Sequence, residues 1–328
     1  MRERYRGTLL GVAVGDALGA PIEFMRWDEI RARYGPEGVR GYVPGPYGRA
    51  AITDDTQMTL ATARGLLRAA SLLASGDRED VARFIYGAYL EWLAAQDDPG
   101  QRRAPGLTCL AALRSGKMGT VERPLNDSKG CGGVMRVAPV GLALPGQPDA
   151  AFALGVRTAA ITHGHAGGYL PAGSLAALLS RLVAGQDLHE AAAAEAHRRE
   201  LDPDTRHLLG RAMDLAQGDL PPAHAIAALG EGWTGDEALA IGVFCALRYA
   251  GSPAKDDCFR QGVLASVNHS GDSDSTGAVA GGILGAWLGE GAIPPDWLTD
   301  LEGRASLVMV ADEIYGAFGT PAPPSVPR

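Results

Sequence analysis

The sequence predicts an all-α protein, organised as a single compact, orthogonal multi-helix domain. Apolar residues recur at spacings of three and four along most of the chain, which is the period of an amphipathic helix. Alternating runs of Val, Ile and Thr between hairpin turns, which would predict strands, are nearly absent. Alanine and glycine are frequent on the predicted helices, so we expect the helix axes to lie close together with thin side chains between them.

The first helix is predicted at the N-terminus. Segment 1–20 begins with basic residues and continues into an apolar run, as a signal peptide does, but Asp16 interrupts the run and Glu23 follows it. We therefore interpret the segment as a helix of the mature protein, ended by Gly19 and Pro21. The later helical patterns lie at 56–73, 81–93, 150–161, 168–182, 237–249, 258–267, 276–288 and 301–315.

Stretches rich in glycine and proline predict the loops, which lie at 34–49, 97–106, 124–133 and 218–222. None of them has the length or polarity of a linker between independent domains, so we predict one domain over residues 1–319. The proline-rich end, 320–328, is predicted to be a disordered tail. No apolar run reaches the ~18 residues that a membrane span requires.

Charge and cysteine content exclude several classes of protein. A net charge of −8 argues against a nucleic-acid-binding surface, which needs clustered Lys and Arg. The 4 cysteines form no CxxC pair, which argues against a disulfide framework and against a thiolate zinc site. A reducing compartment is the simpler interpretation, and we expect a cytoplasmic monomer.

Two short acidic segments, more than 200 residues apart, carry the strongest chemical signal. The first acidic segment is 53–56 (Thr-Asp-Asp-Thr), and the second is 271–276 (Gly-Asp-Ser-Asp-Ser-Thr). Each precedes a predicted helix, where Asp, Ser and Thr are preferred N-cap residues, so capping alone would explain either one. Each also holds a surplus carboxylate, and like charges repel unless a cation lies among them. Carboxylate and hydroxyl oxygens are ligands that Mg²⁺ and Mn²⁺ prefer.

The spacing within these segments indicates a site for two metal ions. Adjacent Asp54 and Asp55 diverge in direction and would more naturally serve two ions than chelate one. The alternate residues Asp272 and Asp274 can point the same way on an extended turn. If the two segments meet in space, a two-metal site ~3.5–4 Å across becomes possible. Zinc is less expected, because the histidines show no ligand spacing beyond 163–165.

Two acidic residues near the first helix have different expected roles. A lone glutamate is usually solvated, but Glu23 lies between Ile22 and Phe24, which favours partial burial and a functional role. Asp16 lies on a helix face lined with glycine and alanine. We expect it to be structural, with its charge satisfied by neighbouring backbone groups.

A glycine-rich turn at 127–136 is a candidate anion site. Glycines let backbone N–H groups approach a phosphate, although the spacing is not that of a Walker A loop and the signal is weak alone. Within this turn Cys131 is expected to be a small packing residue. His163 and His165 lie between two predicted helices, where they either cap a helix, face water, or contact a ribose or phosphate.

Together these residues resemble the ADP-ribosylglycohydrolase family, of the ADP-ribosylarginine hydrolase and dinitrogenase reductase-activating glycohydrolase type. The similarity covers nearly the whole chain in the family's order. The matching segments are 7–24, 53–60, 128–141, 161–165, 232–239 and 268–286. The resemblance implies an all-α domain with a binuclear Mg²⁺ or Mn²⁺ centre at the base of an ADP-ribose cleft.

The resemblance also implies a role for each matching position. The metal ligands would be Thr53, Asp54, Asp55, Asp272, Asp274 and Ser275. Glu23 matches an acidic position near the distal ribose. The loop would wrap the diphosphate through Gly130, Cys131, Gly132, Gly133 and Met135, and His163 would lie along the nucleotide. Many relatives have Asn-Gly where this chain has Cys131-Gly132, so the contact of an Asn side chain is lost here.

The expected activity is metal-dependent hydrolysis of the glycosidic bond at the distal ribose, which releases ADP-ribose from a modified protein or small molecule. Asp55 or Asp274 would take a proton from water, and Glu23 would supply one to the leaving group. The Asp-Ser-Asp-Ser order of the second acidic segment leans toward relatives that act on ADP-ribosyl-arginine. The alternatives are a two-metal phosphoesterase and a catalytically silent ADP-ribose-binding protein.

Overall fold

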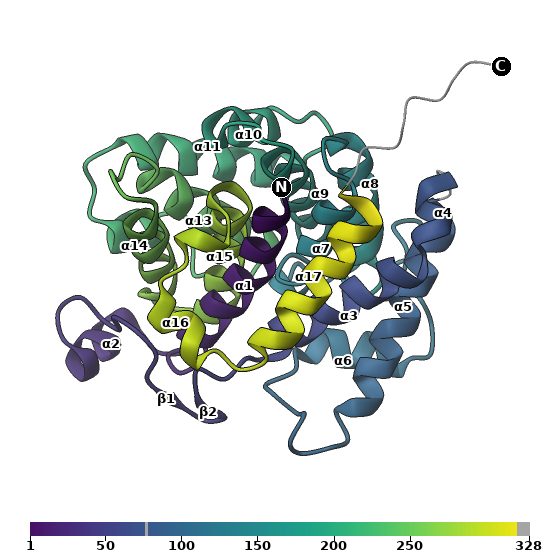
Figure 1. Ribbon diagram of the computed structural model, residues 1–328, viewed down its shortest axis with the longest axis horizontal. Helices are drawn as coiled ribbons and strands as arrows, with labels where there is room; N and C mark the ends of the chain where they lie inside the picture. Colours follow the sequence, from purple (N-terminus) through teal and green to yellow (C-terminus); the bar gives the residue numbers. More distant parts are fainter. Residues whose placement is uncertain (76–77, 320–328) are drawn as a thin grey trace.

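The computed structural model describes residues 1–75 and 78–319, and within these ranges the protein is helical almost throughout (Figure 1). The prediction of an all-α fold is confirmed. The only sheet of the described residues is a two-stranded antiparallel ribbon, β1 (Pro44–Gly45) with β2 (Gly48–Arg49), which lies inside the predicted loop 34–49. The predicted tail 320–328 lies outside the described residues, and the domain boundary at residue 319 stays a prediction.

The described ranges contain 17 α-helices and two short 3-10 helices. The first half of the chain forms α1 (Arg2–Gly19), α2 (Trp27–Tyr34), α3 (Asp54–Arg68), α4 (Ala70–Ser75), α5 (Arg78–Ala95), α6 (Leu107–Arg114), η1 (Cys131–Gly133), α7 (Ala138–Ala143) and α8 (Pro148–Ala160). The second half forms α9 (Ala166–Val183), α10 (Leu188–Ala196), α11 (Pro203–Gln217), α12 (Pro222–Ala227), α13 (Gly235–Arg248), α14 (Lys255–Val267), α15 (Ser273–Leu288), η2 (Glu290–Ala292), α16 (Pro295–Asp300) and α17 (Arg304–Phe318).

Each predicted helical pattern corresponds to at least one helix, with one division and several omissions. The pattern at 56–73 is two helices, because Ala69 leaves helical geometry between α3 and α4. The prediction missed α2, α6, α7, α10, α11, α12 and α16. Most of these are short, and just over half of α10 is alanine, which gives little apolar contrast. The longest, α11, fully buries only Thr205, Leu209 and Ala212.

A contact lined with glycine joins the two helices nearest the acidic segments, α1 and α15, which run antiparallel through the centre of the molecule (Figure 1). A Cβ atom added to Gly11 would lie 2.1 Å from the Gly281 carbonyl oxygen, so no side chain fits between these backbones. The close helix contact expected from the sequence is therefore present. The facing pairs are Gly7–Gly285, Gly11–Gly281, Gly15–Gly277 and Gly19–Ser273.

This contact places the end of α1 beside the start of α15. Other helices cover the pair: α17 packs against α1, α3 and α7, while α13 and α14 pack against α15. In Figure 1, α17 (yellow) lies across α1 and α3. Among the described residues, no helix combines the length and apolarity needed to cross a membrane.

Candidate functional site

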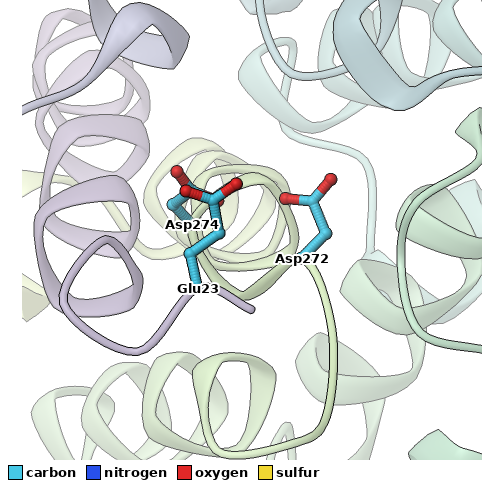
Figure 2. A group of neighbouring side chains, drawn as sticks. All are labelled: Glu23, Asp272 and Asp274. Carbon is cyan, nitrogen blue, oxygen red and sulfur yellow. The ribbon is translucent and has the colours of Figure 1, made fainter. Parts of the chain in front are cut away.

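Glu23 lies just beyond the end of α1, in a turn that aims its side chain at α15. The backbone N–H groups of Ile22 and Glu23 both donate to the carbonyl oxygen of Gly19, at 2.9 and 3.0 Å, which turns the chain sharply. Carboxylate oxygens of Glu23, Asp272 and Asp274 all lie within 4.8 Å of one another. Figure 2 shows the carboxyl groups of Glu23 and Asp274 side by side, with Asp272 pointing toward them.

The first acidic segment is held in place by Asp16, which is fully buried on α1. The Asp16 carboxylate accepts hydrogen bonds from Thr53 N (3.0 Å) and Oγ1 (2.8 Å) and from Thr56 N (3.2 Å) and Oγ1 (2.5 Å). Burial raises the pKa of Asp16 to about 6, against the opposing effect of these bonds. The structural role expected for Asp16 is therefore observed, with hydroxyl groups as well as backbone groups as donors.

Asp54 and Asp55 point to different neighbours. Asp54 Oδ2 accepts the backbone N–H of Gly106 at 3.1 Å, from the predicted loop 97–106. Burial raises the pKa of Asp55 well above its usual value, and a hydrogen bond with the Ser275 side chain opposes this in part. The buried Oδ1 of Asp55 has no hydrogen-bond partner. The two carboxylates of the first acidic segment therefore diverge, and one of them reaches the second acidic segment.

The second acidic segment begins α15, with Asp272 as the N-cap. Its carboxylate accepts the N–H of Ser275 at 3.3 Å, and Asp274 Oδ1 accepts the same N–H at 3.0 Å. The backbone N–H of Asp272 donates to the carbonyl of Glu231 at 2.8 Å. The Cys131 thiol donates to Asp272 Oδ2 at 2.8 Å. The prediction that Cys131 is only a packing residue is therefore wrong, because its sulfur bonds to a predicted metal ligand.

Neutral groups complete the support of this segment. Thr276 Oγ1 lies 2.9 Å from His269 Nε2, and His269 Nδ1 lies 2.8 Å from the carbonyl oxygen of Ser270. Burial lowers the pKa of His269, so the ring is neutral at neutral pH. A carbonyl oxygen only accepts, so we assign the ring proton to Nδ1. The Thr276 hydroxyl has the carbonyl oxygens of Ser266 and Asp272 as acceptors at 2.7 Å, besides Nε2 at 2.9 Å.

Six buried or half-buried carboxylates meet at this point without a balancing cation. They belong to Asp16, Glu23, Asp54, Asp55, Asp272 and Asp274. In the part of the chain that the structure describes, no Lys, Arg or His forms an ion pair with any of them.

The pKa values of these carboxyl groups are raised, because the groups are buried beside one another and no positive charge balances them. Burial, followed by repulsion from Asp272, raises the pKa of Glu23 to about 8. Burial also raises the pKa of Asp54 to about 8, and it raises that of Asp274 well above its usual value, with Glu23 adding to the effect. An all-oxygen donor set of carboxylates, together with the unpartnered Asp55 Oδ1, fits hard divalent cations.

The predicted diphosphate loop lies directly beside the second acidic segment. Its residues Cys131–Gly133 form η1, and the Cys131 N–H donates to the carbonyl of Trp233 at 3.1 Å. The Met135 sulfur accepts the Ser275 hydroxyl at 3.9 Å. His163, only 2% exposed, lies against the loop, since a Cβ on Gly132 would be 2.8 Å from its Cε1. The structure thus brings the loop, His163 and the acidic segments together.

The two histidines of segment 163–165 have separate environments. Burial, with the Arg136 guanidinium nearby, lowers the pKa of His163 to about 3, so its ring is neutral. Its Nδ1 lies 2.8 Å from the Thr162 hydroxyl. His165 is the N-cap of α9 and accepts the N–H of Gly167 at 2.9 Å. The capping alternative therefore describes His165.

Sequence reasoning did not anticipate the aromatic edge of the site. Phe24 was used to predict burial around Glu23, yet it is 70% exposed, so that part of the argument is wrong. Its ring stacks on that of Trp233, with centroids 5.2 Å apart and planes at 22°. Phe24 also has a φ of 67°, which is unusual for an aromatic residue. In the sequence, the one indication that Phe24 belongs to the site was its position next to Glu23.

The comparisons with known proteins agree with this geometry. A family model described as ADP-ribosylglycohydrolase matches residues 1–324. The chain belongs to the ADP-ribosylglycohydrolase family. A solved structure described as an ADP-ribosylglycohydrolase-related protein complex has a TM-score of 0.73 and 29% identity, and the match covers 96% of this chain and 98% of that one.

Curated relatives of this family member match over most of their length. The ADP-ribosyl-[dinitrogen reductase] glycohydrolase of Rhodospirillum rubrum is 30% identical, over 92% of this chain and 91% of the relative. The ADP-ribosylhydrolase ARH3 of Mus musculus is 26% identical, over 96% and 92%. The ADP-ribosylarginine hydrolase Tri1 of Pseudomonas putida is 25% identical, over 95% and 78%. Membership of the family supports ADP-ribosyl glycohydrolase activity.

A separate cavity of about 790 Å³ lies between α2, α12 and α14. Arg31, Arg40 and Arg260 line it, together with the aromatic rings of Trp27 and Tyr249. None of the predicted site residues borders this cavity. The cavity is therefore separate from the predicted site.

Proposed function

We propose that this family member is a metal-dependent hydrolase that cleaves the glycosidic bond at the distal ribose of an ADP-ribosylated protein or small molecule and releases ADP-ribose. The observation that carries the proposal is the group of six carboxylates that converge without a counter-charge, beside a glycine-rich loop. A stable protein keeps such a group when a bound cation balances it. Tri1, named for ADP-ribosylarginine, supports an arginine-linked substrate, as does the Asp-Ser-Asp-Ser order of the second acidic segment.

Two Mg²⁺ or Mn²⁺ ions would be held by the carboxylates and hydroxyls of the two acidic segments. The ligands are Thr53, Asp54, Asp55, Asp272, Asp274 and Ser275. When bound, the ions would neutralise these carboxylates and act as Lewis acids toward the ribose hydroxyls and a water molecule.

The remaining steps belong to residues of the chain. Backbone groups of residues 130–133, with Met135 and the neutral ring of His163, would position the diphosphate and nucleotide. The carboxylate of Asp55 or Asp274 takes the proton of the attacking water. The ring of the distal ribose gains positive charge in the transition state, and the surrounding carboxylates stabilise that charge.

Glu23 is assigned as the proton donor to the leaving group. Burial is the largest cause of its raised pKa, and burial favours the protonated form of the carboxyl group. Its half-buried position at the edge of the acidic centre leaves it open to a substrate. A protonated carboxylic acid can donate to a nitrogen or oxygen leaving group, so this assignment holds for N- and O-linked substrates.

The decisive experiment measures release of free ADP-ribose from ADP-ribosyl-arginine and from ADP-ribosyl-serine, with Mg²⁺, with Mn²⁺ and with EDTA. We expect release that depends on the metal and is faster from the arginine-linked substrate. Cleavage within the diphosphate would instead identify a phosphoesterase. Binding of ADP-ribose without turnover of either substrate would identify a silent binding protein.

Variants at the two acidic segments test the residue assignment. Asp54→Asn and Asp274→Asn keep the side-chain shape but remove a charged ligand, and we expect kcat/KM to fall by more than about 100-fold. Mn²⁺ should raise the Tm of the wild-type protein and not that of either variant. Asp204→Asn is the matched control, because Asp204 lies in the first turn of α11 as Asp54 does in α3 and Asp274 in α15. Wild-type activity in either test variant would contradict the assignment.

A further inference from the structure

The stacked pair of Phe24 and Trp233 forms an exposed aromatic surface at the edge of the acidic centre. Phe24 is 70% exposed and Trp233 is 36% exposed, although both rings are large and apolar. Trp233 covers one face of the Phe24 ring, so the exposed area of Phe24 includes its other face. An exposed apolar ring beside a site is a candidate contact surface for a ligand.

Backbone bonds fix both residues to the elements of the candidate site. Phe24 directly follows Glu23, and its N–H donates to the carbonyl of Gly271 at 3.3 Å. The carbonyl of Trp233 accepts the N–H of Cys131 at 3.1 Å. The pair therefore spans the edge between the proposed proton donor and the predicted diphosphate loop.

The backbone of Phe24 shows that the outward position of its ring is enforced. A φ of 67° lies in the left-handed region, which an aromatic side chain rarely adopts. Burial of the ring does not account for this conformation, because the ring is exposed. The conformation instead directs the ring outward while Glu23 points toward Asp272 and Asp274.

Charges around the pair favour a cation. The indole Nε1 of Trp233 donates to Glu231 Oε2 at 3.2 Å, so a carboxylate borders the pair on that side. The faces of aromatic rings attract cations, and nearby carboxylates strengthen that attraction.

We propose that Phe24 and Trp233 form the binding platform for the leaving group, and that the group they fit is the planar guanidinium of ADP-ribosyl-arginine. This inference rests on the proposed function, because it assigns the part of the substrate beyond the bond that is cut. The guanidinium stacks on the open face of Phe24, and Trp233 supports that ring from behind. A serine-linked substrate has no such cation and gains nothing from the platform.

The experiment compares kcat/KM for the two substrates in Phe24→Gly and Trp233→Leu. Glycine accepts the left-handed φ without strain, so Phe24→Gly removes the ring with little risk to folding. We expect a loss of about 2- to 5-fold on ADP-ribosyl-arginine, the range of an exposed cation–π contact, and no measurable loss on ADP-ribosyl-serine. Phe24→Tyr and Trp233→Phe keep an aromatic face and should restore the arginine preference.

Two controls separate a platform from a general defect. Phe84, on α5, is also an exposed phenylalanine, at 41%, and Phe84→Ala should leave both substrates unchanged. Calorimetric titration with free ADP-ribose, which lacks the leaving group, should give the same Kd for the wild type and both platform variants.

Each contrary result has a distinct meaning. An equal loss on both substrates, no loss on either, or weaker binding of free ADP-ribose would overturn the platform while leaving the proposed function in place. Wild-type activity confined to the serine-linked substrate would overturn it as well. Absence of wild-type turnover on both substrates would overturn the proposed function, and this inference with it.

Discussion

The two acidic segments both begin a helix, yet they are held by different kinds of group. The first is anchored by the Asp16 carboxylate, which reaches it from α1 and accepts bonds from Thr53 and Thr56. The second is anchored by neutral groups, both near it in the chain, such as His269 beside Thr276, and distant from it, such as the Cys131 thiol. One charged side chain supports one half of the site, and a network of uncharged groups supports the other.

This difference indicates how each half should respond to substitution. The first acidic segment depends on a single carboxyl group, whose loss leaves several buried donors without partners. The bonds of the second are spread over a hydroxyl, an imidazole and backbone carbonyls, so one change removes less. The second also depends on a histidine, which brings sensitivity to acid.

The largest effect is expected from Asp16→Ala. It orphans two buried backbone N–H groups and two hydroxyls, each worth roughly 1–3 kcal/mol when unsatisfied. Loss of a buried charge offsets part of this cost, so we expect the free energy of unfolding to fall by about 3–5 kcal/mol in urea titrations. Asp312→Ala, at an exposed pair with Arg2 and Arg6, should cost no more than about 1 kcal/mol. Equal losses in the two variants would remove the distinction between the anchors.

A smaller effect is expected from Thr276→Val, which keeps the side-chain shape but removes the hydroxyl that contacts His269 Nε2 and the carbonyl oxygens of Ser266 and Asp272. We expect the free energy of unfolding to fall by about 2 kcal/mol, less than for Asp16→Ala. The control is Thr158→Val, because the Thr158 hydroxyl is also buried but bonds only to the Leu154 carbonyl of its own helix. A loss as large as that of Asp16→Ala would show that the network of uncharged groups is not redundant.

The smallest effect is a difference in pH dependence. Burial lowers the pKa of His269, so the folded protein binds fewer protons at this site than the unfolded chain does. Its contribution to stability is present above the unfolded pKa of about 6.5 and is lost as pH falls toward the lower folded value. His269→Gln should abolish this part of the pH dependence, by up to about 1.4 kcal/mol per pH unit.

The measurement is urea unfolding of wild type and His269→Gln in EDTA at pH 7.5, 6.0 and 5.0. His163 and the carboxylates are present in both proteins, so their titrations cancel in the difference. A difference that stays constant with pH would contradict a neutral, buried His269.

Local features of the site could be predicted from the sequence, because helix caps are decided within a few residues. Thr53 and Asp272 cap helices that begin two and three residues before the predicted patterns at 56 and 276, and Gly19 ends α1 as predicted. The two acidic segments come together because α1 packs against α15. The glycines in the sequence predicted close helix contacts, but not which helices form them. The bond from Cys131 to Asp272 crosses 141 residues of chain, and no local pattern encodes it.

The exposure of Phe24 shows a second limit of sequence reasoning. Ile22 is fully buried, and an apolar residue two positions later was expected to share its environment. The left-handed backbone at Phe24 reverses the direction of the ring, and only contacts with Gly271 and Trp233 specify that turn. Tertiary contacts of this kind override local apolar pattern.

The glycine contact between α1 and α15 can form only late in the synthesis of the chain. More than 250 residues separate Gly19 from Ser273, so α1 emerges from the ribosome long before its partner exists. At about 5–20 residues per second, that interval is roughly 13–50 s. During this time the glycine-lined face of α1 has no α15 to pack against. The nascent chain therefore presents its first helix to chaperones, and the acidic centre is assembled only when the last quarter of the chain has been made.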